Sequence, residues 1–178
     1  MAAPTVAGTL KVQAPVFIRK LRRGNDWGQP GDPMPERVEL AVQQIFRNQP
    51  EAEISIYVVS SDDDLCRIAI GINAGRDSLS ESMTFLVFTK SELDAAGISA
   101  PAKTPGNLKC DYANALHFDM TATDAEIIQF CANLMAAGRA AARCTEGAMK
   151  AASKLAIAEN CKSVPNITQC GVNACSGS

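Results

Sequence analysis

Apolar residues in the first third of the chain recur at the spacing of a helix. Between residues 33 and 48 they lie three and four positions apart, which places them on one helical face; they are Val38, Ala41, Val42, Ile45 and Phe46. Asp32 can accept hydrogen bonds from the first-turn amides, and Pro33 suits the first helical position. The pattern therefore predicts an amphipathic helix over residues 33–48.

A second period, in which apolar and polar residues alternate one by one, is typical of strands. It occurs in segments 54–59, 66–72 and 115–120. Residues 54–72 are expected to form a hairpin with an acidic tip at Asp62, Asp63 and Asp64. The segment 83–88 is apolar on both faces, which predicts a central strand covered on both sides. Residues 5–12 and 15–21 are two further candidate strands.

Capping residues mark a short helix in the middle of the chain. Ser91 and Asp94 have the spacing of a capping box, and Gly97 suits the left-handed position past a helix end. The proline- and glycine-containing residues 99–109 then predict a loop.

Thr123 and Glu126 form a second capping-box pair and open a stripe of apolar and small residues that continues to Leu155. Alanine and glycine dominate the later part of this stripe. We expect either one long helix that lies close to another backbone, in another subunit or in the same chain, or an interruption near Gly138 or Gly147.

Together these elements predict a single α+β domain. We expect an antiparallel or mixed sheet of four to six strands, packed by helix 33–48 and a long Ala-rich C-terminal helix. The predicted organisation is a basic N-terminal arm and loop (1–32), the α+β domain (33–160) and a cysteine-containing tail (161–178). The order of elements resembles small acidic secretion chaperones and other dimeric adaptor folds, and this resemblance concerns topology alone.

The composition supports a folded, soluble protein. Of the 178 residues, 47% are hydrophobic and 20% are charged, with a net charge of −2, which excludes a disordered chain. The longest apolar runs are far shorter than the ~18 residues of a membrane span, and no basic segment at the start leads into an apolar run. We therefore expect a cytoplasmic protein that does not enter a membrane.

Positive charge gathers near the N-terminus. Residues 1–23 contain five basic and no acidic side chains, whereas the remaining residues contain 12 basic and 19 acidic ones. The arm can dock on the acidic body, reach another subunit or meet a polyanion. Its candidate binding residues are Arg19, Lys20, Arg22, Arg23 and the only tryptophan, Trp27, which could stack on a base. With a pI near 5.4, we favour an acidic protein partner over nucleic acid.

The only histidine, His117, limits the possible catalytic sites. A multi-histidine metal site is excluded, and any nucleophile–histidine–acid arrangement must use this residue. His117 and Asp119 lie two apart on one strand face, and Cys110 is close in sequence. A thiol site with Cys110 as nucleophile, His117 as base and Asp119 as orienting acid can be drawn. In the alternative reading, His117 and Asp119 simply face solvent.

The seven cysteines contain no Cys-x-x-Cys pair, and their odd number argues against a secreted disulfide framework. Cys161, Cys170 and Cys175 lie among small polar residues, where a redox disulfide, zinc or a chemical modification can be considered. The ligand spacing of a zinc site is missing. We expect neither a metal nor a cofactor.

The favoured hypothesis is a non-enzymatic binding or adaptor protein that works through a protein partner or by self-association, for instance a homodimer through helix 123–158. Three alternatives stay open. The first is a small thiol enzyme or redox protein that uses Cys110 or the tail cysteines with His117. The second is a folded carrier whose Ser/Thr/Cys tail is modified, and the third is a weak nucleic-acid binder that uses the basic arm.

Overall fold

An antiparallel sheet forms the centre of the fold, in the order β4-β5-β2-β1-β3-β6-β7. The computed structural model describes residues 15–21, 27, 38–39, 42, 53–76, 79, 82–139, 141–145, 147–161 and 172–174. The strands are β1 (Val16–Lys20), β2 (Glu53–Val59), β3 (Ser82–Phe88), β4 (Ala102–Lys103), β5 (His117–Thr121), β6 (Ala142–Thr145) and β7 (Val172–Ala174). Five of them have four or more residues and two are short edge strands. The predicted α+β class is confirmed.

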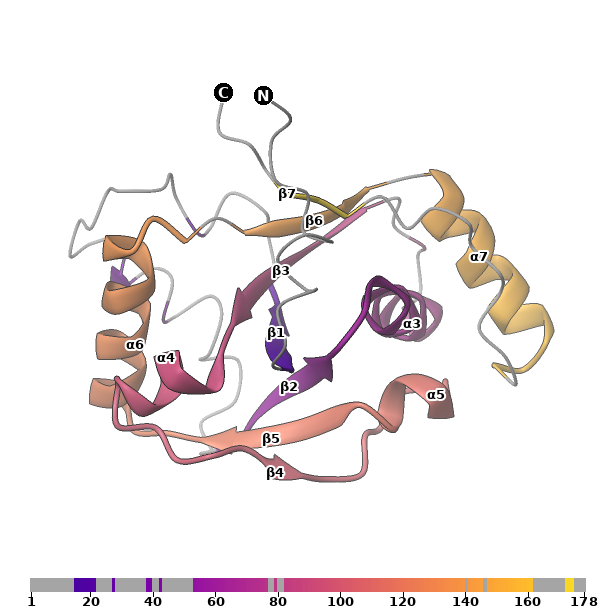
Figure 1. Cartoon of the computed structure of the whole chain (residues 1–178). Helices are drawn as coiled ribbons and strands as arrows, with labels where there is room; N and C mark the ends of the chain where they lie inside the picture. Colours follow the sequence, from indigo (N-terminus) through magenta and orange to yellow (C-terminus); the bar gives the residue numbers. More distant parts are fainter. Residues whose placement is uncertain are drawn as a thin grey trace.

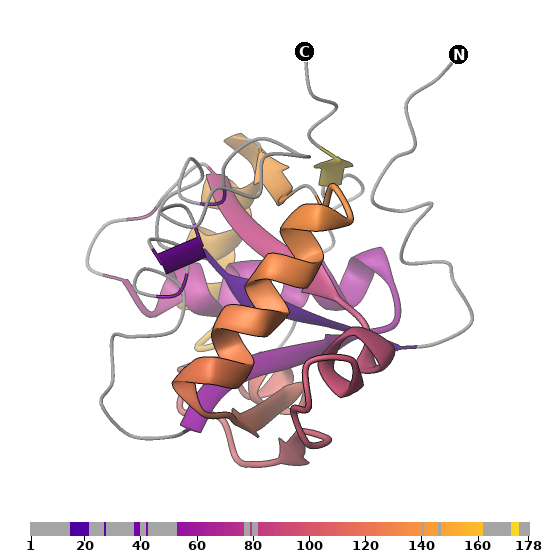
Figure 2. The ribbon, with the colours of Figure 1, turned by 90° about the vertical axis from the view of Figure 1, so that its left-hand side faces the viewer.

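Helices cover both faces of the sheet. On one face lie α4 (Lys90–Asp94) and α6 (Asp124–Ala136), and on the other lie α3 (Asp62–Ala74) and α5 (Asp111–Asn114). Figure 1 shows α4 and α6 to the left of the strands and α3 and α5 to the right, with α7 (Gly147–Ala158) outside α3. Turned by 90°, the molecule shows α6 crossing in front of the sheet (Figure 2).

Strand alternation sends side chains into two cores. Phe17 of β1 packs toward α6, whereas its neighbours Val16 and Ile18 pack toward α3. The same alternation occurs in β3, where Phe88 meets the α6 side and Val87 the α3 side. Because β3 lies between β1 and β6 and is buried on both faces, the prediction for segment 83–88 is confirmed.

The predicted strand 66–72 is wrong, because this segment lies in helix α3. Ser61 caps the helix by accepting a hydrogen bond from the Asp64 amide, so the expected acidic hairpin tip is the first helical turn. Leu65 packs toward the sheet, whereas Ile70 packs toward α7. A helix buried on two sides carries apolar residues at almost every second position, which imitates a strand. The predicted order of elements, on which the resemblance to secretion chaperones rests, is therefore absent.

The long C-terminal helix is not confirmed. The Thr123 and Glu126 capping box is present and starts α6, but α6 ends at Ala136. Gly138 follows with φ +68°, and the chain continues as strand β6 before α7 begins. The interruption near Gly138, which the sequence left open, is therefore what occurs.

The small-residue face of α7 is used within the chain. Ala152 and Ala156 pack against Ile70 and Ala74 of α3. In the same interface the Asn73 side-chain amide donates a 2.8 Å hydrogen bond to the Ser153 hydroxyl. Both of these polar residues are buried, so the bond fixes how the two helices align.

Helix α4 starts at a different capping residue from the one predicted. Thr89 accepts from the Glu92 amide and Glu92 accepts from the Thr89 amide, so the box is Thr89 and Glu92, not Ser91 and Asp94. The Thr89/Glu92 and Ser91/Asp94 pairs both have the spacing of a capping box, so the sequence alone does not distinguish them. Gly97 has φ +80°, as the sequence predicts.

Part of the predicted organisation falls outside the described residues. This holds for candidate strand 5–12 and for most of helix 33–48, although Val38 and Val42 are helical and buried against the α6 core. Two described strands come from the predicted arm and tail: β1 lies between β2 and β3, and β7 pairs with β6. The folded body therefore draws on both of these segments.

Candidate functional site

Four polar side chains gather where β4, β5 and β2 run side by side. We call Ser55, Thr104, His117 and Asp119 the His117 cluster. Ser55 pairs with Asp119 across the β2–β5 ladder, and the Thr104 amide donates to the His117 carbonyl. Paired residues of an antiparallel ladder point to the same face. The cluster therefore lies on the α3 side of the sheet, near β4 and β5 at the bottom of Figure 1.

Hydrogen bonds join the members of the cluster to one another. The Thr104 hydroxyl donates to Asp119 Oδ2 at 2.7 Å and lies 2.9 Å from His117 Nδ1. Ser55 donates a longer bond, 3.4 Å, to Asp119 Oδ1. An ionised carboxylate only accepts, so the single hydroxyl proton of Thr104 points at Asp119. Thr104 must then accept from His117, which assigns the proton of neutral His117 to Nδ1.

The imidazole of His117 is buried. His117 is 6% exposed, and the Tyr57 ring meets it edge-on with a centroid distance of 5.3 Å. Its Nε2 lies 3.7 Å from Asp119 Oδ1. The alternative in which His117 faces solvent is therefore not what the structure shows, whereas Asp119 keeps 18% of its side chain exposed.

A partly buried arginine adds positive charge beside the carboxylate. Arg19 of β1 donates a 2.5 Å hydrogen bond from Nη1 to the Ser55 carbonyl. Burial lowers the pKa of Arg19, and the nearby Tyr57 and Asp119 partly oppose that shift. Burial likewise raises the pKa of Tyr57. A guanidinium stays protonated in proteins, so Arg19 places a positive charge next to the His117 cluster.

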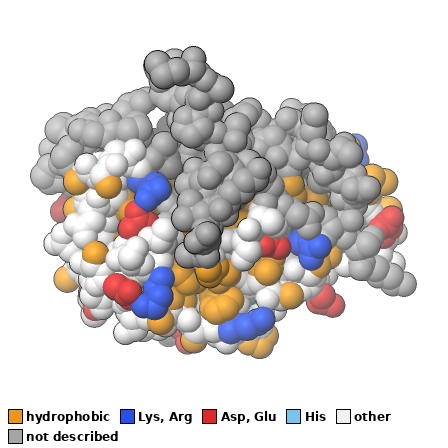
Figure 3. Space-filling model, viewed as in Figure 1, with side chains coloured by type: hydrophobic (Ala, Val, Ile, Leu, Met, Phe, Trp, Pro, Cys, Tyr) orange, Lys and Arg blue, Asp and Glu red, His pale blue; other side chains and the backbone are white. Residues whose placement is uncertain are grey.

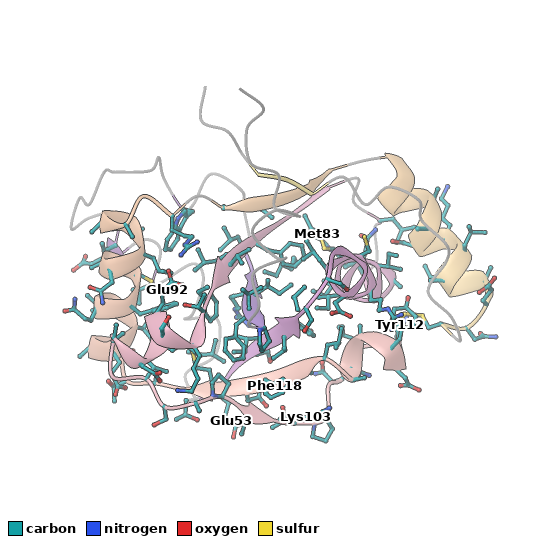
Figure 4. The ribbon with its side chains drawn as sticks, viewed as in Figure 1. Glu53, Met83, Glu92, Lys103, Tyr112 and Phe118 are labelled. Atoms are coloured by element: carbon teal, nitrogen blue, oxygen red, sulfur yellow. A yellow bond between two sulfur atoms is a disulfide. The ribbon has the colours of Figure 1, made fainter. Side chains whose placement is uncertain are left out.

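None of the cysteines whose side chains are described offers a free thiol beside His117. Cys110, the candidate nucleophile, is joined to Cys161 by a disulfide, with the two Cα atoms 4.8 Å apart. Figure 4 shows this bond near Tyr112, between α5 and the end of α7. Cys131 is free and buried, and burial raises the pKa of its thiol to about 12. Cys170 and Cys175 lie outside the described residues.

The described residues of the predicted basic arm lie in different environments. Trp27 is buried, and its indole N–H donates to the Arg139 carbonyl at 2.6 Å, so the ring serves the core. Lys20 is part of β1, and its pKa is lowered by burial and then by the charges of Arg76 and Arg19. Arg22 and Arg23 lie outside the described residues. On the face seen in Figure 3, basic and acidic side chains are interspersed.

Sequence reasoning missed Thr104 and Ser55. Ser55 could have been found by pairing strands 54–59 and 115–120 in the correct register. Thr104 carries no such signal, because it lies in a segment predicted as a loop. Among the side chains that the structure describes, no three His, Cys, Asp or Glu residues gather as a metal site requires.

Compared with protein-family models, curated proteins and solved structures, the chain matches none of them. Within the described part of the chain, no helix is long and apolar enough to cross a membrane.

Proposed function

We propose that this chain is a non-enzymatic binding protein that acts through a protein partner. The observation that carries the proposal is the closed hydrogen bonding of the His117 cluster. A hydroxyl nucleophile must donate to the imidazole, so that the imidazole can take its proton. Here the Thr104 hydroxyl donates to Asp119, which supports a structural role for these residues.

The state of the cysteines also supports a binding protein over a thiol enzyme. A catalytic cysteine needs a thiolate in a partly exposed, electropositive site. Cys110 and Cys161 form a disulfide with each other, and Cys131 is buried with a raised pKa. None of the three offers a thiolate beside His117.

We propose the exposed parts of α7, on either side of the face that packs on α3, as the contact surface. The face of α7 that carries the small residues packs on α3. The self-association predicted through these small residues can therefore use only the part of α7 that stays exposed. Leu155 and Ile157 are 55% and 46% exposed. Large exposed apolar side chains on an outer helix favour a protein contact, and a second copy of this chain is the partner to test first.

The enzymatic alternative is tested with covalent probes. A fluorophosphonate reports activated hydroxyls and iodoacetamide reports activated thiols. On the folded protein neither is expected to label Thr104 or any described cysteine, whereas iodoacetamide should label Cys131 after unfolding. Rapid labelling of Thr104 that disappears in a His117→Gln variant would contradict the proposal.

The contact surface is tested by light scattering over a range of protein concentrations. Leu155→Glu with Ile157→Glu is expected to abolish the concentration-dependent rise in mass. The matched control is Ile128→Glu on α6, whose side chain is 40% exposed on the opposite side of the sheet. A wild-type chain that stays monomeric throughout, or a loss of mass that the control reproduces, contradicts α7 as the surface of self-association.

A further inference from the structure

Disulfide cysteines occur throughout the layer formed by α3, α5 and α7. Cys110 is the N-cap residue of α5, and Cys161 follows the end of α7. Their bond therefore ties the start of one helix to the end of another. Cys66 of α3 is also disulfide-bonded. The three described helices on this side of the sheet thus carry or adjoin a cross-linked cysteine.

The local structure places Cys161 firmly. The Cys161 amide donates to the Ala156 carbonyl at 2.7 Å, and the Asn160 amide donates to the Ile157 carbonyl at 3.1 Å. These two bonds form a Schellman cap. Asn160 and Cys161 have φ of 52° and 56°, the left-handed region that residues other than glycine rarely adopt. The end of α7 is thus fixed in a specific conformation that directs Cys161 toward α5.

The surroundings of the bond are apolar core. Cys110 and Cys161 are buried together with Ile70, Ala74, Ala152 and Ala156. Their Cα separation of 4.8 Å falls within the range that a disulfide spans, roughly 4.4 to 6.8 Å. Because Cys110 is 0% and Cys161 8% exposed, a bond formed there is largely shielded from small thiols.

We propose that the protein matures and works in an oxidising compartment, where Cys110 and Cys161 are joined by exchange with a disulfide-bearing oxidoreductase. A cysteine thiolate attacks the oxidoreductase disulfide and forms a mixed disulfide. The second cysteine, as thiolate, then attacks the mixed disulfide and releases the oxidoreductase. In total the two cysteines lose two electrons and two protons, and the oxidoreductase disulfide is reduced to a dithiol.

The compartment follows from the place of the bond in the buried core. Structural disulfides are stable in oxidising compartments and are rare in the cytosol, where thiols are kept reduced. This proposal departs from the cytoplasmic location expected from the sequence. The odd number of cysteines, which argued against a secreted disulfide framework, needs only one unpaired residue, and Cys131 is free and buried.

Peptide mapping of the protein from its native source tests the proposal. Free thiols are alkylated in denaturant without reductant, and the chain is then cut with trypsin. Cleavage after Lys109 and Lys154 places Cys110 and Cys161 in different peptides. The expected result is a cross-linked pair of these peptides that separates only on reduction. Cys131 shares the Cys110 peptide and should be alkylated, which confirms complete labelling. Alkylation of both Cys110 and Cys161 would overturn the proposal.

A stability measurement supplements the mapping. The bond closes a sequence separation of 51 residues, and opening a loop of this size is expected to lower the folding equilibrium constant about a thousandfold. Because the bond is buried in the folded protein, each chain is reduced in denaturant and refolded with reductant present. This treatment should lower the Tm of a Cys66→Ala chain but not that of the same chain with Cys110→Ala and Cys161→Ala. Equal Tm values with and without reductant in the first chain would contradict a stabilising Cys110–Cys161 bond.

Discussion

Replacing Thr104 with valine separates a structural His117 cluster from a catalytic one. Valine has nearly the shape of threonine but cannot hydrogen-bond. The change removes the 2.7 Å bond to Asp119 and the acceptor of His117 Nδ1–H. A hydrogen bond to a charged group contributes about 1.5 to 3 kcal/mol, and a buried donor left unpaired costs about 1 to 3 kcal/mol.

The two costs do not simply add. Asp119 keeps Ser55 as a donor, and its 18% exposure lets water replace part of what is lost. His117 has less access to water because only 7% of its side chain is exposed. We therefore expect Thr104→Val to lower the free energy of unfolding by about 2 to 3 kcal/mol.

Urea unfolding at fixed pH, with the disulfides kept oxidised, measures this loss. Trp27 is the only tryptophan and is buried, so its fluorescence reports the transition. The midpoint should fall while the slope stays unchanged. Thr121→Val makes the same substitution at an exposed position of β5 and should change stability little. Unchanged or increased stability of Thr104→Val would refute the structural role, since replacing an active-site residue often stabilises a protein.

Three further predictions concern helices on both sides of the sheet. Gly71→Ala should destabilise by about 1 kcal/mol in urea unfolding, because overpacking outweighs the gain in helix propensity: its Cβ would lie 2.6 Å from Ala113 Cβ, and added Ala113→Gly should restore stability. Hydrogen bonds from the Thr123 backbone and side chain lower the pKa of Glu126. The stabilisation that Glu126 gives α6 is therefore present above the ordinary glutamate pKa and is lost as pH falls through the lowered pKa. Thr123→Ala should raise the pKa of Glu126, measured as the midpoint of its titration by NMR. Cys131, whose pKa burial raises to about 12, should resist a thiol reagent until the protein unfolds, and labelling at the rate of an exposed cysteine would contradict its burial.

The sequence was a good guide where one signal had one interpretation. The segment 83–88, apolar on both faces, predicted the central strand β3, and the capping box of Thr123 and Glu126 predicted the start of α6. It failed at α3, because a helix buried between the sheet and α7 has the apolar density of a strand. It also failed after Ala136, because the small residues of the stripe do not reveal that Gly138 turns the chain into β6.

The candidate site was predictable only in part. The two-residue period of a strand places His117 and Asp119 on one face, and the structure has them 3.7 Å apart. Their partner Thr104 comes from a different strand edge, so only the fold brings it to them. The same reason applies to Cys110 and Cys161, whose pairing depends on how α5 and α7 pack against α3.

The tautomer of His117 is the most direct test of whether the His117 cluster is structural. His117 is the only histidine, so a two-bond proton–nitrogen NMR spectrum of labelled protein, recorded where the imidazole is neutral, reports it without ambiguity. The hydrogen bonds of Thr104 predict the Nδ1–H form, with the imidazole donating to the Thr104 hydroxyl. An Nε2–H form would leave Nδ1 free to accept the hydroxyl proton, which is the arrangement of a general base, and would contradict the proposed non-enzymatic function.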